Sequence, residues 1–243
     1  MSHLTLPTAG LLALTLAAAG GAGQVTLLSQ DRSISADAYV NYFTGDDSIV
    51  DTDYDAGQTS LTGPWVDTAH AYAAADPLYA DAWAEQDSLV STGRLSGYGY
   101  VEFDVDGYAS MSSAESYADS LYTVEFQVAS SQAYELDVTL AAWCSSTWQL
   151  AWAGVELYDA GTSQALFSQW VEYPPGTETT WTSSGTLPAG TYVLHAETVV
   201  SALAIVDVDD GWAWFDFTLG VPAPGTALWL LAGGAVLGRR RGA

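Results

Sequence analysis

A row of three aspartates has the clearest metal-ligand spacing in this sequence. Asp51, Asp53 and Asp55 alternate with other residues in an acidic stretch that begins at Asp46. Carboxylates at this spacing in a loop can surround Ca²⁺ with oxygen ligands. The stretch lacks the glycine and glutamate that an EF-hand loop needs at its sixth and twelfth positions, so it is not an EF-hand. We favour a solvated acidic loop and keep calcium as the candidate cofactor, with residues 207–211 as a weaker second candidate.

Tryptophans are concentrated in the second half of the chain. Exposed rings on a sheet face can stack on the apolar faces of sugar rings, whereas buried rings are normal in the core of a β-sandwich. Trp212 and Trp214 must share one face of their strand, because alternate side chains of a strand point the same way. We expect the set to lie mainly in the core, with sugar stacking as the alternative. The set comprises Trp143, Trp148, Trp152, Trp170, Trp181, Trp212 and Trp214.

Few residues in the chain could serve a nucleophilic mechanism, which needs a hydroxyl or thiol beside a base. No Gly-x-Ser-x-Gly motif is present, and His70 and His195 are the only histidines besides His3. His195 lies in an apolar strand run, where we expect it to face solvent or a structural partner. Cys144 is the single cysteine, so no intrachain disulfide or zinc spacing exists, and we expect a buried thiol. We therefore predict no catalytic activity.

The charge balance excludes one class of partner. The chain has five basic residues, no lysine and 29 acidic residues, for a formal net charge of −24. Such a surface cannot neutralise phosphates, so we expect no nucleic-acid binding. Because the chain has so many acidic residues, a pair of carboxylates is no evidence for glycoside hydrolysis, which needs only two.

The elements that must position these residues follow a period of two, which predicts strands. About ten runs alternate in this way, with Pro and Gly turn signals between them. One polar face per strand and short connections indicate an antiparallel sandwich, and we predict an all-β, jelly-roll-like β-sandwich over residues 24–220. The stretch from Ser183 resembles the penultimate hairpin of jelly-roll modules, with its turn at Pro188-Ala189-Gly190.

Residues 65–90 are ambiguous. Their alanine content favours a helix, but large and small side chains alternate, and Pro77 would break a single helix. We favour two strands, with a short surface helix as the alternative.

Both ends of the chain suggest export. Residues 1–23 contain an apolar run at 11–19 followed by small residues, which is typical of a cleavable signal peptide; an N-terminal anchor or a core helix is the alternative. Residues 226–238 form a short apolar run that ends at Arg239, Arg240 and Arg241. A helix of this length rises about 20 Å, less than the roughly 30 Å hydrocarbon core of a bilayer. The arginines would hold its end on the cytoplasmic side, as in a temporary anchor.

The C-terminal segment 221–243 resembles the PEP-CTERM sorting signal of bacterial exported proteins. It has Val221-Pro222-Ala223-Pro224, then the apolar run, then the arginine cluster, with Ala223 where the family signature has glutamate. The resemblance implies a transmembrane sorting helix and cleavage by an exosortase, a membrane cysteine transpeptidase. An ordinary tail anchor is the alternative.

Together these features predict an exported, non-catalytic protein, anchored in the membrane as a precursor and then at the cell surface or in the extracellular matrix. The exosortase is its expected partner. A carbohydrate-binding module for an extracellular polysaccharide is the first alternative, and a secreted glycosidase is the second. Exposed, coplanar tryptophans would favour the former, and a cleft with two facing carboxylates the latter.

Overall fold

The computed structural model describes residues 25–43, 48–107, 113–146, 149–172, 177–204 and 208–221. Within these ranges the chain forms strands and no helix. The strands are β1 (Val25–Phe43), β2 (Ser48–Thr59), β3 (Gly63–Ala75), β4 (Leu78–Val90), β5 (Arg94–Asp106), β6 (Ser113–Val128), β7 (Gln132–Cys144), β8 (Leu150–Asp159), β9 (Ala165–Glu172), β10 (Thr179–Leu187), β11 (Gly190–Ala204) and β12 (Val208–Gly220).

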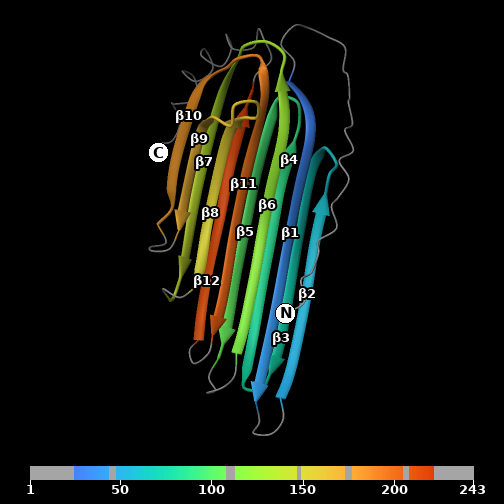
Figure 1. Cartoon of the computed structure of the whole chain (residues 1–243), viewed down its shortest axis with the longest axis vertical. Helices are drawn as coiled ribbons and strands as arrows, with labels where there is room; N and C mark the ends of the chain where they lie inside the picture. Colours follow the sequence, from blue (N-terminus) through green and yellow to red (C-terminus); the bar gives the residue numbers. More distant parts are fainter. Residues whose placement is uncertain are drawn as a thin grey trace, which may run out of the picture.

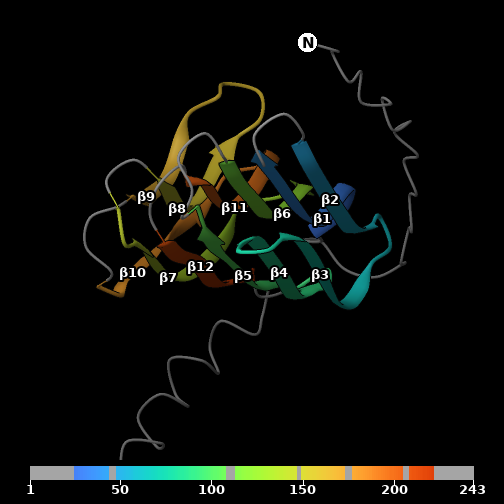
Figure 2. The same ribbon diagram turned by 90° about the horizontal axis from the view of Figure 1, so that it is seen from below.

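In the described ranges, twelve strands run side by side in two layers (Figures 1 and 2). Sheet A has the order β2-β1-β6-β11-β8-β9, and sheet B has the order β10-β7-β12-β5-β4-β3. Every pairing between the described strands is antiparallel. The predicted all-β sandwich is thus confirmed.

The last eight strands are wound as nested pairs. β5 pairs with β12, β6 with β11, β7 with β10, and β8 with β9. These pairs alternate between the sheets, which is the winding of a jelly roll. The first four strands extend it on one side, where β2 and β3 become the neighbouring edges of the two sheets (Figure 2).

The core is built differently in its two halves. Around β5, β6 and β12 it holds large rings, including an edge-on contact of Tyr122 with Phe217 whose centroids are 4.8 Å apart. Under β1, β3, β4 and the adjoining part of β6 it is lined by alanines, and Cα atoms of β1 and β4 come within 8 Å of one another. Sheets usually pack about 10 Å apart, so small side chains bring these layers closer together. The alanines are Ala36, Ala38, Ala69, Ala71, Ala73, Ala75, Ala80, Ala82, Ala84, Ala114 and Ala118.

The two-strand prediction for residues 65–90 is confirmed, because β3 and β4 form an antiparallel hairpin there. Between Ala69 and Ala84 the alternation of large and small residues has a direct cause: the buried positions are mostly alanine, and most of the polar and aromatic residues between them point outward. Cys144 is buried as expected, and desolvation raises the pKa of its thiol.

The predicted hairpin around Pro188-Ala189-Gly190 is wrong. β10 and β11 follow one another there but belong to different sheets, so the turn joins the two layers at a corner. The nested winding is the reason, since it pairs β10 with β7 and β11 with β6. In the part of the chain that the structure describes, no helix is long and apolar enough to cross a membrane. The predicted signal peptide (1–23) and sorting helix (226–238) lie outside these residues.

Candidate functional site

The three aspartates lie in a row along β2 and contact the edge of the opposite sheet. Asp55, Asp53 and Asp51 accept hydrogen bonds from the backbone N–H groups of β3 residues His70, Tyr72 and Ala74, at 3.2, 3.0 and 2.9 Å. Edge strands present unpaired backbone groups. We call this set the aspartate ladder, because its carboxylates pair the outward N–H groups of β3 as a neighbouring strand would.

Gly57 ends the aspartate ladder. It is the next residue of β2 on the same face, and it has no side chain to reach β3. Asp67 of β3 occupies that space instead: a Cβ added to Gly57 would lie 2.2 Å from the Asp67 carboxylate. The Asp67 carboxylate accepts from the N–H of Thr68 at 3.0 Å.

The loop expected around Asp51, Asp53 and Asp55 is wrong, since these residues belong to a strand paired with β1 along its whole length. Their carboxylates are spread along β2 and do not surround one point. Among the described residues no group of three or more His, Cys, Asp or Glu could hold a metal ion. Calcium binding here stays a prediction. In the second candidate stretch, Asp209 accepts hydrogen bonds from Gln149 and Ser145, and residue 207 lies outside the described ranges.

The expected core position of the tryptophans is wrong for most of the set. Trp181 packs partly buried against the core, but five others lie partly exposed on the outer faces of the sheets. These five are Trp143, Trp152, Trp170, Trp212 and Trp214, while Trp148 lies outside the described residues. The alternation of each strand places them outward, because the inner positions are already filled by alanine, phenylalanine and leucine.

An aromatic platform lies on the outer face of sheet A, where β9, β8 and β11 meet. Trp170 is 41% exposed and is the most exposed tryptophan among the described residues. Its ring lies over the backbone of Gly154, where an added Cβ would come 2.0 Å from the ring. Its Nε1 donates to Glu156 at 3.0 Å, and Trp152 lies beside it with ring centroids 5.2 Å apart at 50°. We use the name aromatic platform for Trp152, Trp170, Glu156, His195 and Glu197.

His195 lies in β11, on the side of the aromatic platform away from the edge strand β9. Its Nδ1 is 3.0 Å from the Thr123 hydroxyl, its Nε2 is 3.4 Å from the Glu197 carboxylate, and its ring centroid is 6.5 Å from that of Trp170. The order hydroxyl–imidazole–carboxylate resembles a hydrolase triad, but acyl transfer also needs N–H groups aimed at the oxyanion. Here β6 and β11 pair on both sides, so their backbone N–H groups are used in the sheet. The histidine has the structural partner that was expected of it.

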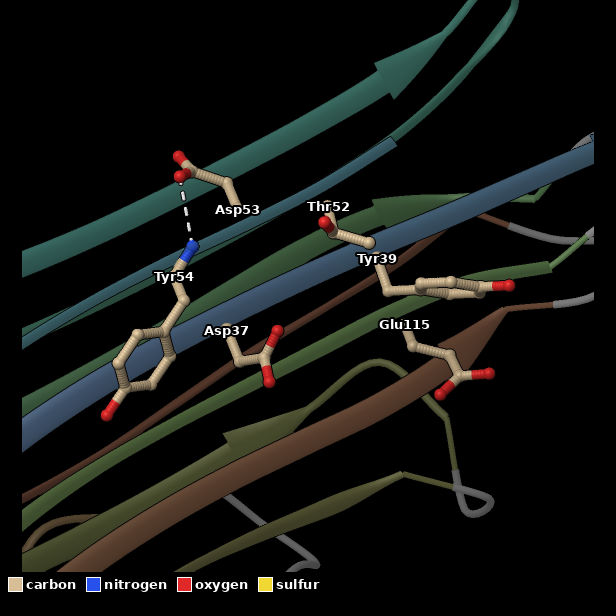
Figure 3. A pocket seen from close by; sticks show the side chains of 6 residues that line it. All are labelled: Asp37, Tyr39, Thr52, Asp53, Tyr54 and Glu115. Carbon is tan, nitrogen blue, oxygen red and sulfur yellow. Dashed lines mark hydrogen bonds between the residues drawn. The ribbon is translucent and has the colours of Figure 1, made fainter. Parts of the chain in front are cut away.

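A shallow hollow lies on the same face of sheet A, over β1, β2 and β6 (Figure 3). Its lining combines phenol rings with carboxylates, and none of the lining residues that the structure describes is basic. Burial raises the pKa of Asp37. The hollow therefore offers mainly hydrogen-bond acceptors and ring faces, as the aromatic platform does. Its lining residues are Asp37, Tyr39, Thr52, Asp53, Tyr54 and Glu115.

The outer face of sheet B also carries aromatic and acidic side chains. His70 lies against Trp83, with centroids 5.3 Å apart, and its Nε2 is 2.7 Å from the Asp81 carboxylate. The Tyr79 hydroxyl donates to Asp104 at 3.0 Å, and desolvation with this contact raises the pKa of Tyr79 to about 12. These contacts pair the polar groups of this face with one another, and His70 is paired with a carboxylate.

Of the predicted sorting residues the structure describes only Val221. Its side chain is buried and its N–H donates to the carbonyl of Gly93 at 3.2 Å. Pro222, Ala223, Pro224, Arg239, Arg240 and Arg241 lie outside the described residues.

No protein-family model matches the chain, and no curated protein matches it. Among solved structures it is similar to a mutant VP2 protein of infectious bursal disease virus, at 10% identity over 84% of this chain and 65% of that one, with a TM-score of 0.20. It is also similar to a GH31 alpha-xylosidase from Xanthomonas citri, at 10% identity over 87% of this chain and 38% of that one, with a TM-score of 0.17. The chain thus spans less than two thirds of the length of either protein, and likenesses this distant carry no functional argument.

Proposed function

We propose that this chain is an exported, non-catalytic protein of the cell surface or extracellular matrix, sorted through its C-terminal segment by an exosortase. The observation that carries the proposal is the order of elements at the C-terminus: Pro222-Ala223-Pro224, the apolar run 226–238, and the arginine cluster that follows it. A signal peptide at 1–23 would start the export, and the precursor would stay in the membrane until the sorting helix is removed.

The position of Val221 supports this arrangement. β12 ends at Gly220, and Val221, the last residue that the structure describes, is held by its buried side chain and its hydrogen bond to Gly93. Cleavage just beyond it would leave all twelve strands intact. The acid-rich surface suits a soluble exported body, because like charges keep such molecules apart.

Mass spectrometry of the protein from its native host tests the proposal. The mature chain should end near Pro224 and lack Arg239, Arg240 and Arg241. Replacing these three arginines with alanine should leave the precursor unprocessed, because the basic end would no longer hold the segment across the membrane. A mature wild-type protein that still ends at Ala243 would contradict sorting and leave an ordinary tail anchor.

A second candidate function is carbohydrate binding, and the aromatic platform favours it. A ring that is held flat against a strand and half exposed offers an apolar face, and the carboxylates beside it accept hydrogen bonds from hydroxyl groups. An extracellular polysaccharide would be the partner. This candidate is compatible with sorting, since the platform lies on the body and the signal on the tail.

A further inference from the structure

We propose that the aromatic platform is a binding site for an uncharged glycan built of hexopyranose units whose hydroxyl groups are mainly equatorial. The inference rests on the carbohydrate-binding candidate and names its site and ligand chemistry. Among the outer-face rings, the site is assigned to the one around Trp170.

The Trp170 ring is prepared for stacking before any ligand arrives. The absence of a side chain at Gly154 lets the ring lie on the backbone, and the hydrogen bonds of its Nε1 to Glu156 and Ser168, at 3.0 and 3.2 Å, fix its direction. A ring that is already ordered loses little conformational freedom when a ligand stacks on it. Its 41% exposure leaves one face for a partner, whereas the other outer-face tryptophans are covered to a greater extent.

The groups around the ring select ligands that donate hydrogen bonds. Glu156 accepts from Ser168 at 2.7 Å as well as from Trp170, and Glu197 lies on the other side of Gly154, with which it is paired. No lysine occurs in the chain, and neither Arg32, which is buried, nor Arg94, which begins β5 in sheet B, lies on this face. A sugar with equatorial hydroxyls matches this pattern, because its hydroxyls point outward around the ring and its C–H groups form an apolar face.

Charge then decides between classes of glycan. The chain carries a formal net charge of −24, so a glycan with uronate or sulfate groups would be repelled. A cationic ligand would be attracted everywhere on this surface, not specifically at Trp170. An uncharged glycan is the ligand for which the ring, not the overall charge, sets the affinity.

The experiment is calorimetric titration of the exported protein with cellohexaose and chitohexaose as uncharged probes. Chitosan hexamer, alginate oligomers and a hexalysine peptide serve as charged comparisons. We expect binding of at least one uncharged probe, with an affinity that changes little between about 0.05 and 0.5 M NaCl, since salt screens only interactions between charges. Trp170→Ala should weaken it about tenfold or more, and Trp170→Phe should weaken it less.

Two further variants locate the site. Gly154→Ala keeps every aromatic residue but forces the Trp170 ring off the backbone, so it should also weaken binding. Trp214→Ala removes a matched ring from the outer face of sheet B, 6.3 Å from Tyr98, and should leave the affinity unchanged. Far-ultraviolet circular dichroism and thermal melting establish that each variant is folded.

The outcomes separate the site from the function. An uncharged probe could bind with an affinity that Trp214→Ala weakens and Trp170→Ala does not. That result would overturn the site assignment, while carbohydrate binding would stand. If only chitosan or hexalysine binds, and salt abolishes the binding, the ligand chemistry is overturned. If no saccharide binds the folded wild type, both this inference and the carbohydrate-binding candidate fail, and the sorting proposal is untouched.

Discussion

Arg32 is an unusual charged residue, since its side chain is fully buried between the sheets. Its guanidinium donates to carbonyl oxygens: Nη1 to Gly63 at 3.1 Å and to Ser88 at 3.3 Å, and Nη2 to Leu61. It also lies 5.7 Å from the Trp65 ring. Burial lowers the pKa of Arg32. The residue thus ties the connection between β2 and β3 to β4, using main-chain acceptors in place of a carboxylate.

Replacing Arg32 tests this role. Arg32→Met keeps most of the side-chain volume but leaves several carbonyl groups without their charged donor, and each such hydrogen bond contributes about 1.5–3 kcal/mol in favourable cases. We expect the free energy of unfolding to fall by about 2 kcal/mol or more, measured by urea denaturation. Arg94→Met is the matched control, because Arg94 is exposed and the change in net charge is the same. Equal losses in the two variants would mean that only net charge matters.

β2 contributes almost no buried side chain to the core. Its burial pattern is exposed at nearly every position, so its attachment to the body consists of its pairing with β1 and the aspartate ladder to β3. The ladder closes one side of the sandwich and occupies the backbone donors to which another strand could pair. It therefore stabilises β2 and protects the β3 edge without any metal.

The aspartate ladder makes a prediction about β2 that is independent of calcium. In the presence of a metal chelator, Asp53→Ala should lower the melting temperature, because the N–H of Tyr72 loses its acceptor. Since the position is exposed, the free energy of unfolding should fall by only about 1 kcal/mol. Asp53→Asn keeps an acceptor oxygen and should lose less. Asp87→Ala, an exposed aspartate on the outer face of β4, controls for the change in charge. If Asp87→Ala is as destabilising as Asp53→Ala, the ladder does not hold β2.

The same proteins test the calcium prediction. A site at Asp51, Asp53 and Asp55 would make millimolar Ca²⁺ raise the melting temperature more than Mg²⁺ does at matched ionic strength, because an ion bound only by the folded state stabilises it. The difference should vanish in Asp53→Ala. Equal shifts by the two ions in the wild type would remove calcium and leave the aspartate ladder as the function of these residues.

At the scale of the whole molecule, the sequence pattern predicts the strands well but does not predict how distant strands pair. Period-two alternation in the sequence is sufficient for the all-β class, the sandwich and the two strands of residues 65–90. It does not say which strands become neighbours, so the corner between β10 and β11 and the contact of β2 with β3 were not predictable from it. The outward position of Trp170 depends on Gly154 in a neighbouring strand, and only the fold brings the two together. The spacing of Asp51, Asp53 and Asp55 does signal a shared strand face, once the segment is assigned to a strand.

The acidic surface sets how the whole molecule responds to pH. Burial raises the pKa of Asp37, Asp104, Asp119 and Asp216 above the ordinary value of 3.8. A carboxyl group with a higher pKa in the folded state binds its proton more tightly there, so the folded state gains stability as the pH falls toward that ordinary value, and loses it as the pH rises through the raised pKa. Protonation also relieves repulsion within a chain of net charge −24.

We therefore expect the melting temperature to rise as the pH is lowered from about 7 to about 4.5. In a chain of this size, each kcal/mol gained in the free energy of unfolding corresponds to a rise of about 2–4 °C. Adding NaCl up to about 0.5 M should raise it more at pH 7 than at pH 4.5, because fewer charges remain to be screened at the lower pH. Asp119→Asn removes the most enclosed of these carboxyl groups, which contacts the Ser35 hydroxyl, and should reduce the pH dependence. Asp87→Asn, at an exposed position, should leave it nearly unchanged. A melting temperature that falls steadily from pH 7 to pH 4.5 would show that ionised carboxylates stabilise the folded state, as the aspartate ladder would if it outweighed the four carboxyl groups with raised pKa values.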